Sequence, residues 1–409
     1  MTSIYSAAKV KELDVKEIEI EGITSFQLMQ RASKALCLEV EKTLNGTSID
    51  TIVVLASGGN NGGDALCVAD MLCDKYKVVV FYVKVSDRQS DDFKQAYRKL
   101  KNVYVQEVSS VADVCFLKEY ISAKNVCILD GLLGSGINRV VEKESFFGTL
   151  IDYVNAYRDR DNSILIAVDL PSGLLGEDSQ LSNASRSIIM ADKTICLQYP
   201  KLSTMMPESE RYVGSMTFVD FDMRLMKEGS GDLGTLLELH DIRKMIHKRP
   251  KHGHKGTFGK GLLAAGSCDM PGACVLAAKS SMRSGLGMLY VQTHENVKPY
   301  LLNSLPEAIC RTDISGIDSM YSATNAIAVG PGIGTDDYAR HLFLSCLSTT
   351  DHPMVVDADA LNLISNNKEW IDKLAPQTIL TPHPAEFQRL FGKCSSRMEM
   401  IARQKEMAK

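Results

Sequence analysis

The chain has 409 residues, a length that accommodates two domains, each with its own buried core. Its 45% hydrophobic and 23% charged residues are the proportions of an ordinary globular protein. The formal net charge of −4 argues against a nucleic-acid-binding surface, and no segment is long and apolar enough to span a membrane.

Eleven cysteines are scattered along the chain, and none of them forms a Cys-x-x-Cys pair. Most lie in apolar runs, as Cys67, Cys115, Cys127, Cys196 and Cys346 do. This usage predicts buried free thiols in a reducing compartment rather than disulfides or zinc ligands. The first fourteen residues lack the apolar core of a signal peptide, so we expect a cytoplasmic protein.

The chain begins with two predicted amphipathic helices, over 6–20 and 24–44, and Thr24 or Ser25 is expected to cap the second. A buried strand over 52–56 then runs into a stretch rich in glycine and asparagine, 58–64. We predict a tight loop there, followed by a helix from Ala65. Free backbone N–H groups at such a junction favour anions, and the glycines let a ligand approach the backbone.

Strands and helices alternate through the rest of the first half of the chain. Strands are predicted over 78–83, 103–108, 125–133, 164–169, 193–197 and 215–221, and helices over 91–101, 111–123 and 146–157. This alternation predicts an α/β domain with a mostly parallel sheet and helices on both faces. In such sheets ligands bind at the carboxyl ends of the strands.

Polar side chains stand where three of these strands end. They are Asn61, Asp130, Asp169 and Ser172. A single carboxylate in such a place is usually a cap or a turn former. Two carboxylates with an amide and a hydroxyl, and with no histidine or thiolate, instead suit a hard cation or a proton-transfer site.

A basic stretch, 243–255, contains His247, His252 and His254, but Pro250 and Gly253 break any helix that would align them. We interpret it as a solvated linker or a nucleotide-facing loop and not as a metal site. A second α/β unit starts at Gly256. Its predicted strands are 261–265, 285–293, 325–329, 354–356 and 378–380, and its predicted helices are 273–284, 360–363, 386–391 and 397–409.

Taken together and in order, the motifs resemble those of a known family. The sequences GGNNGGD at 58–64, DGLLGSG at 130–136, DLPSG at 169–173 and YPK at 199–201 resemble the NAD(P)HX epimerase domain. The sequences KGTFGK at 255–260, GSCDMPGA at 266–273, GPGIG at 330–334, DADALN at 357–362 and TPHPAEF at 381–387 resemble the NAD(P)HX dehydratase domain, which has a ribokinase-like fold. The resemblance implies a Rossmann-like three-layer α/β/α epimerase domain over 1–225, a linker over 226–255 and a ribokinase-like domain over 256–409.

The resemblance implies repair of NADH or NADPH that has been hydrated at C6 of the nicotinamide ring. The epimerase domain of the family interconverts the R and S hydrates in the presence of K⁺. Its potassium ligands match Asn61, Asp130 and Ser172, and Asp169 and Lys201 are the expected catalytic residues. Asp169 and two loops would hold the hydrate, and these loops comprise Asn60, Asn61, Gly62, Gly63 and Asp64, and Gly134, Ser135, Gly136, Ile137, Asn138, Arg139 and Val140.

The dehydratase domain of the family removes water from the S hydrate with ADP or ATP, and Mg²⁺ accompanies the nucleotide. Its hydrate positions match Ala273, Gly332, Gly334 and His383. The family then continues into a nucleotide-binding strand and a Gly-Thr-Gly-Asp turn that carries the catalytic base, and this sequence contains neither. We therefore expect an incomplete second domain with no dehydratase activity of its own.

Two other functions remain open at this stage. A ribokinase-like small-molecule kinase would fit the fold of the second unit, although the sequence TPHPAEF favours the repair enzyme. A non-catalytic binding scaffold would fit the first unit, but such a scaffold need not keep Asn61, Asp130, Asp169, Ser172 and Lys201 together. Beyond the small-molecule substrate, a homo-oligomer is expected because dimers are common for this fold.

Overall fold

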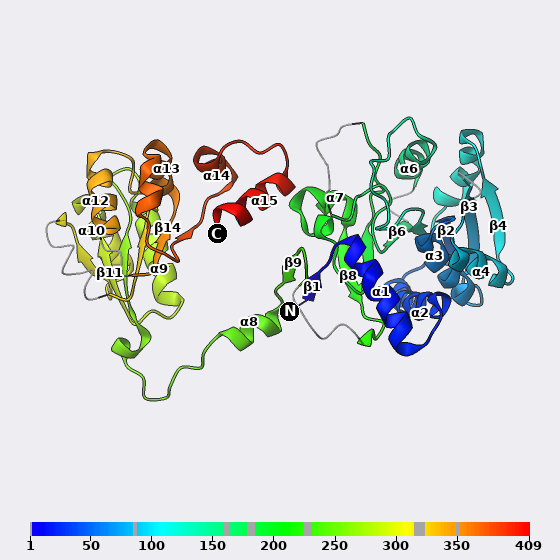
Figure 1. The fold of residues 1–409 in the computed structure, drawn as a ribbon, viewed down its shortest axis with the longest axis horizontal. Helices are drawn as coiled ribbons and strands as arrows, with labels where there is room; N and C mark the ends of the chain where they lie inside the picture. The colour runs from blue at the N-terminus through cyan, green and yellow to red at the C-terminus, as the bar shows by residue number, and fades with distance from the viewer. Residues whose placement is uncertain are drawn as a thin grey trace. The chain divides into compact units, whose positions relative to one another are not determined.

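The computed structural model describes residues 2–84, 88–158, 163–177, 185–224, 231–314, 324–348 and 352–409. The chain forms two compact units, Met1–Ile246 and His247–Lys409. Each unit consists of a parallel sheet flanked by helices (Figure 1). Both units therefore have the α/β architecture that the alternation of strands and helices predicts.

The first unit is built on a seven-stranded sheet in the order β4-β3-β2-β5-β6-β7-β8, in which all neighbouring strands are parallel. The order places β2 and β5 at the centre, so their carboxyl ends open onto the middle of one edge. The strands are β2 (Thr51–Ser57), β3 (Lys77–Val83), β4 (Tyr104–Val108), β5 (Val126–Gly131), β6 (Ser163–Val168), β7 (Lys193–Leu197) and β8 (Ser215–Val219).

Most helices of this unit lie where the apolar spacing predicts them, and Thr24 caps α2 with a reciprocal capping box to Gln27. The helices are α1 (Ala7–Glu21), α2 (Ser25–Leu44), α3 (Asn60–Leu72), α4 (Asp91–Lys99), α5 (Lys118–Ile121), α6 (Phe146–Tyr157), α7 (Glu210–Val213) and α8 (Leu239–Met245). The prediction of one helix over 111–123 is wrong, because Val111–Leu117 is a 3₁₀ helix and only α5 is α-helical. The segment interpreted as a linker contributes β9 (Gly234–Leu236), which pairs antiparallel with β1 (Thr2–Ile4).

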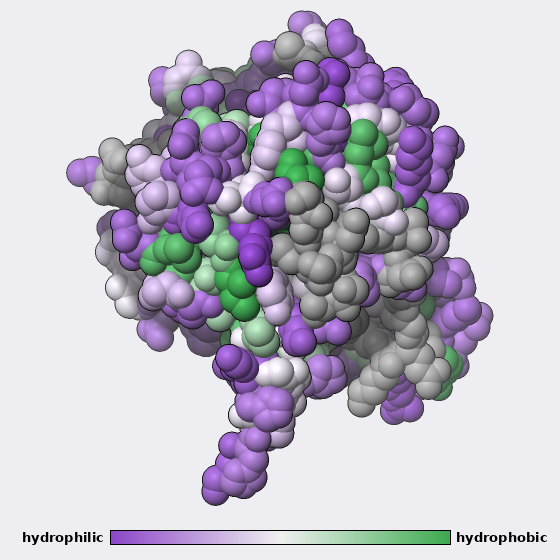
Figure 2. All heavy atoms as spheres, turned by 90° about the vertical axis from the view of Figure 1, so that its left-hand side faces the viewer, coloured by the Kyte–Doolittle hydropathy of each residue, from purple (hydrophilic) through white to green (hydrophobic). Residues whose placement is uncertain are grey.

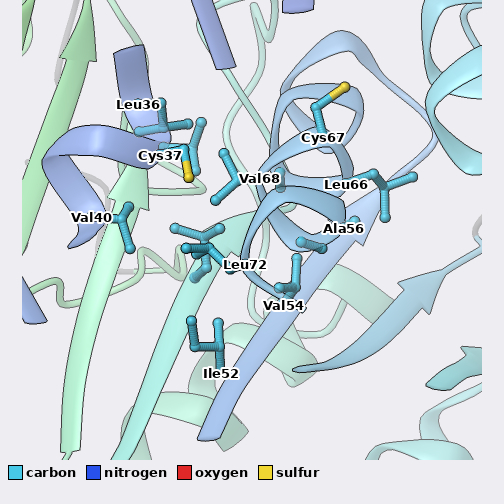
Figure 3. Close-up of a cluster of buried hydrophobic side chains, with 14 of the residues drawn as sticks. Leu36, Cys37, Val40, Ile52, Val54, Ala56, Leu66, Cys67, Val68 and Leu72 are labelled. Atoms are coloured by element: carbon cyan, nitrogen blue, oxygen red, sulfur yellow. The ribbon is translucent and has the colours of Figure 1, made fainter. Parts of the chain in front are cut away.

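Two apolar clusters cover the two faces of this sheet. Ile52, Val54 and Ala56 of β2 point to one face, where they pack against α2 and α3 (Figure 3). Val53 and Leu55 point to the other face and pack with residues of α6 and the 111–121 segment. Burial on both faces explains why these strands appear in the sequence as continuous apolar runs rather than as alternating patterns.

The helix after β2 begins earlier than predicted. The stretch 58–64 is not a loop throughout, because α3 starts at Asn60 with Gly59 as its N-cap. A Cβ atom on Gly62 would lie 1.9 Å from the backbone oxygen of Ser57. The absence of a side chain at Gly62 therefore lets the first turn of α3 pack directly on the end of β2.

We expect Gly62→Ala to lower the free energy of unfolding by about 3 kcal/mol, because backbone atoms cannot move aside as a flexible side chain would. The measurement is urea unfolding followed by circular dichroism. Gly136→Ala is the control, since a Cβ atom there has nothing within 4 Å. Equal stability of the two variants would show that the close approach of α3 to β2 is unimportant.

The second unit has a six-stranded sheet in the order β12-β11-β10-β13-β14-β15, again with parallel neighbours. Its strands are β10 (Lys260–Ala264), β11 (Met288–Gln292), β12 (Ile309–Arg311), β13 (Ala326–Val329), β14 (Met354–Val356) and β15 (Ile379–Leu380). Its helices are α9 (Pro271–Arg283), α10 (Lys298–Ser304), α12 (Asp337–Leu347), α13 (Ala358–Asn366), α14 (Pro384–Phe391) and α15 (Arg397–Met407). Of these elements, α10, β12 and α12 are not predicted by the sequence analysis.

The face shown in Figure 2 is mainly hydrophilic, and its hydrophobic residues form small separate groups. Among the described residues, no helix combines the length and the apolar character needed to cross a membrane. All eleven cysteines are free thiols. The prediction that they are buried is wrong for Cys115 and Cys268, which are exposed.

Candidate active site

A cavity of about 640 Å³ in the first unit opens at the carboxyl ends of its strands. Its walls come from α1 and α2, from the start of α3, and from the segments that follow β5, β6 and β7. The residues that line it include Asn60, Asn61, Asp64, Gly134, Ser135, Gly136, Ile137, Asp169 and Lys201. The structure thus brings most of the predicted hydrate-binding and catalytic positions of the first domain to one cavity. The predicted positions that are not among its lining residues are Gly62, Gly63, Asn138, Arg139 and Val140.

Asp169 and Lys201 form a buried ion pair in this cavity. The Lys201 Nζ atom lies 2.5 Å from Asp169 Oδ1, and the two side chains are 6% and 10% exposed. The same carboxylate oxygen accepts a hydrogen bond from the Leu197 backbone N–H, while Nζ also donates to the Tyr199 carbonyl. Asp169 has a φ of +64°, so a left-handed backbone turns its side chain from the end of β6 toward β7.

Asp130 and Ser172 are both fully buried and are linked by two hydrogen bonds. The Ser172 backbone N–H and Oγ–H donate to the Asp130 carboxylate at 2.8 and 2.6 Å. Burial raises the pKa of Asp130 to about 6, because the loss of hydration disfavours the charged carboxylate. In the described part of the chain, only hydrogen bonds from neutral donors counteract this effect. Asp130 is therefore ionised at neutral pH without a cationic side chain to balance it.

Asn61 lies close to this pair. It is 9% exposed, and its side-chain Nδ2 has no hydrogen-bond partner. A Cβ atom on Gly134 would lie 3.3 Å from Asn61 Oδ1, which places the amide against the segment that follows β5. The three predicted potassium ligands thus combine buried oxygen atoms with an uncompensated negative charge, which is the donor set that a hard cation prefers.

Asp64 lies one turn further along α3 and accepts one hydrogen bond, from the Ser33 hydroxyl at 2.9 Å. Burial raises the pKa of Asp64 to about 8, and nearby carboxylates, that of Asp169 foremost, add to the shift. Asp64 therefore carries its proton at neutral pH. The cavity holds one carboxyl group in an ion pair and another kept neutral by its surroundings.

Helices α1 and α2 also contribute to the site, although their sequences do not predict it. Asp14 and Lys11 of α1 line the cavity, and burial raises the pKa of Asp14 to about 6. Nothing in the local sequence distinguishes Asp14 from a surface residue of a charged helix. Ser33 is different, because it falls four residues after Met29 on the apolar face of α2. A hydroxyl on a buried helical face needs a partner, and this signal was available from the sequence.

In the second unit, the predicted positions follow neighbouring strands. A Cβ atom on Gly332 would lie 2.7 Å from that of Ala273, so the segments after β10 and β13 touch there. The Gly334 N–H donates to Asp359 at the start of α13. His383 follows β15 and caps α14: its Nδ1 accepts from the Ala385 N–H, and Nε2 lies 3.1 Å from Glu386. The structure accounts for His383 as a helix cap, with its side chain 58% exposed.

Comparison with known protein families assigns both units. The family model described as YjeF-related protein N-terminus matches residues 25–203, and that described as NAD(P)H-hydrate dehydratase matches residues 262–409. The two matches follow one another in the order of the two units.

Similar proteins carry both domains. The bifunctional NAD(P)H-hydrate repair enzyme Nnr of Coxiella burnetii is 29% identical over 96% of this chain and 76% of its own length. The enzyme of the same name from Thermofilum pendens is 28% identical over 95% of this chain and 74% of its own length. A solved structure, the ADP/ATP-dependent NAD(P)H-hydrate dehydratase of Bacillus subtilis, is 36% identical over 42% of this chain and 60% of that one, with a TM-score of 0.33.

The chain spans about three-quarters of the length of these curated relatives. The expected resemblance is confirmed in both halves of the sequence and over nearly all of its length. With an epimerase-type unit followed by a ribokinase-like unit, the chain belongs to the family of bifunctional NAD(P)H-hydrate repair enzymes.

Proposed function

We propose that the first unit interconverts the R and S epimers of NADHX and NADPHX in the cytoplasm. The observation that carries this proposal is the buried Asp169–Lys201 pair at the wall of the cavity. Lysine and backbone donors hold one oxygen of Asp169, which orients the carboxylate while leaving its second oxygen for proton transfer.

The reaction follows from the chemistry of the hydrate. The C6 hydroxyl stands next to the ring nitrogen N1, whose lone pair expels it once the oxygen has received a proton. The product of this step is a ring with a C6–N1 double bond and a positive charge. Water then adds to either face of C6, and a carboxylate takes the proton that the water loses. Asp169 is suited to this proton transfer, and Lys201 positions it.

The start of α3 is suited to the phosphates of the substrate. Its N-cap is Gly59, and no side chain caps this end, so the first N–H groups of the helix are free of side-chain acceptors. Asn60 and Asn61 line the cavity at the same point. We infer that the pyrophosphate lies against this helix end, where the helix dipole favours negative charge.

Asn61, Asp130 and Ser172 are the residues that we propose to hold K⁺. When bound, K⁺ would balance the buried Asp130 charge and hold the ends of β5 and β6 together. The residues fit this role because the described residues offer Asp130 no cationic partner, and because all three are buried and carry side-chain oxygen atoms.

We expect KCl to raise the melting temperature at pH 8 relative to choline chloride of equal ionic strength. The folded-state pKa of Asp130, about 6, lies above the ordinary value of 3.8, so ionisation destabilises the fold as pH rises through this window. A cation offsets that cost only where Asp130 is ionised. The increase in melting temperature should therefore be a few degrees at pH 8 and smaller at pH 5. Each kcal/mol of added stability raises the melting temperature of a domain of this size by about 2–4 °C.

Asp130→Asn is the control for the potassium effect, because an amide retains the shape and lacks the charge. Its melting temperature should not respond to KCl at either pH. An equal response of this variant and the parent protein would contradict the assignment of Asp130 to the cation.

For the second unit we propose binding of the same hydrate through Ala273, Gly332 and Gly334, with His383 nearby at the end of β15. The proximity of Ala273 to Gly332 supports this proposal. ADP or ATP with Mg²⁺ would serve dehydration in this family, but the 409 residues contain no Gly-Thr-Gly-Asp turn. We expect these residues by themselves to form no NADH from the S hydrate when ADP and Mg²⁺ are added.

The test of the proposed chemistry uses water enriched in the heavy oxygen isotope. Because the C6–O bond breaks and water returns to either face, the hydrate should gain heavy oxygen at least as fast as its epimers exchange. Mass spectrometry of the separated epimers measures both rates. Epimer exchange without uptake of the isotope would contradict a mechanism that breaks this bond.

A further inference from the structure

The cavity contains a second carboxyl group whose environment is opposite to that of Asp169. Asp169 is paired with Lys201 at 2.5 Å. Asp64 is 8% exposed and lines the same cavity, and its one hydrogen bond comes from a neutral hydroxyl. In the described part of the chain, no lysine or arginine forms an ion pair with Asp64.

The charged and titratable groups around Asp64 come from several elements, and three of the six are carboxylates. Asp14 and Lys11 line the cavity from α1, Asp92 from α4, and Asp169 and Lys201 from the segments after β6 and β7, while Cys67 lies one turn away on α3. The carboxylates Asp169, Asp14 and Asp92 disfavour a further negative charge at Asp64. Burial and charge thus both favour the neutral acid, a form that can donate a proton.

We propose that Asp64 donates the proton to the departing C6 hydroxyl, while ion-paired Asp169 accepts the proton of the incoming water. This inference rests on the proposed epimerase function and divides the acid and base roles between two groups. Two carboxyl groups in one site, one buried without a cationic partner among the described residues and one paired with a lysine, are suited to such a division.

The proposed step balances in protons and electrons. The Asp64 proton moves to the hydroxyl oxygen, the C6–O electron pair leaves with it as water, and the N1 lone pair forms the C6–N1 double bond. Incoming water then bonds to C6 and passes its proton to Asp169. The site finishes with Asp64 ionised and Asp169 protonated, so it can run in reverse directly or regain its first state by proton exchange with solvent.

Ser33 becomes a positioning residue under this proposal. It is fully buried on α2, and its hydroxyl donates to Asp64. A hydrogen bond donated to a carboxylate favours the ionised form. Removal of this hydroxyl should therefore raise the pKa of Asp64 and move the loss of activity to higher pH.

The experiment measures epimer exchange from about pH 6 to pH 9 in the parent protein and in three variants. The parent rate should decline above about pH 8, where Asp64 loses its proton. Asp64→Asn should lower kcat by at least about 100-fold, and Ser33→Ala should move the decline to higher pH. Asp70→Asn is the control: Asp70 is on the same helix, but it accepts a hydrogen bond from the Lys101 N–H and does not line the cavity. Its exchange rate and pH profile should match those of the parent.

The outcomes separate this inference from the proposed function. A parent protein that exchanges no epimers overturns the proposed function. A parent that exchanges them while Asp64→Asn keeps its kcat, or raises only KM, overturns the role of Asp64 as the acid. Ser33→Ala tests the same role independently if Asp64→Asn does not fold. If the exchange rate of Ser33→Ala declines at the same pH as that of the parent, or at a lower pH, the proposal is overturned.

Discussion

Asp169→Asn should abolish epimer exchange while leaving the first unit folded. Asparagine tolerates the left-handed backbone at φ +64°, and its amide oxygen can still accept from Lys201 and Leu197. The amide cannot carry a proton, so the rate should fall by about 10²–10⁴-fold, the usual contribution of a general acid or base. Chromatographic separation of the epimers gives the rate, and circular dichroism checks the fold.

Asp222→Asn is the matched control for this variant. Asp222 also has a left-handed backbone, with φ +60°, but it is exposed and does not line the cavity. Its exchange rate should equal that of the parent. A folded Asp169→Asn protein that retains the parent rate would remove Asp169 from the mechanism.

Lys201→Met should produce the largest loss of stability among the variants of the site. The substitution leaves the Asp169 carboxylate buried with the Leu197 N–H as its remaining donor in the described part of the chain. Removal of one partner of a buried ion pair costs about 3–5 kcal/mol. Because acid can neutralise the abandoned carboxylate by protonation, the loss should be smaller at pH 5 than at pH 8. Urea unfolding at both pH values measures it.

Lys42→Met provides the comparison for an exposed pair. Lys42 is 76% exposed and lies 3.3 Å from Glu39, so its loss should cost at most about 1 kcal/mol at either pH. If Lys201→Met cost no more than Lys42→Met, the Asp169–Lys201 pair would contribute nothing to the stability of the cavity wall.

The sequence predicts the strands and the polar residues at their ends with good accuracy. Continuous apolar runs such as 52–56 reveal strands buried on both faces, and the residues that follow them must lie at one edge of a parallel sheet. This reasoning brings Asn61, Asp130, Asp169 and Ser172 to the same edge, as the structure does. The ion pair of Asp169 with Lys201 needs the left-handed turn at Asp169, which the local sequence does not reveal.

Other parts of the fold depend on contacts between distant residues. The start of α3 at Asn60 requires Gly62 to pack on Ser57. The sequence does not predict this contact, because glycines in such a stretch are usually interpreted as loop residues. The pairing of β1 with β9 joins residues more than two hundred positions apart, beyond the reach of any local pattern. Helix α12 is a different case, because Ala339, Leu342, Phe343 and Cys346 have ordinary helical spacing that the sequence analysis did not use.

The neutral state of Asp64 also depends on tertiary structure. In the sequence, Asp64 is one of three polar residues in a glycine-rich stretch, and nothing there separates its role from that of Asn60. Its burial beneath α2 and its contact with Ser33 arise only when the helices pack. The difference between the environments of Asp64 and Asp169 is therefore a property of the assembled cavity.

The central claim is that the first unit is an epimerase, and one time course tests it most directly. A single epimer of NADHX, isolated by chromatography, is incubated with the protein in potassium buffer, and the R/S ratio is followed. We predict that the ratio reaches equilibrium faster than in buffer alone, and that Asp169→Asn removes the acceleration. A ratio that changes at the same rate with and without the parent protein would contradict the claim.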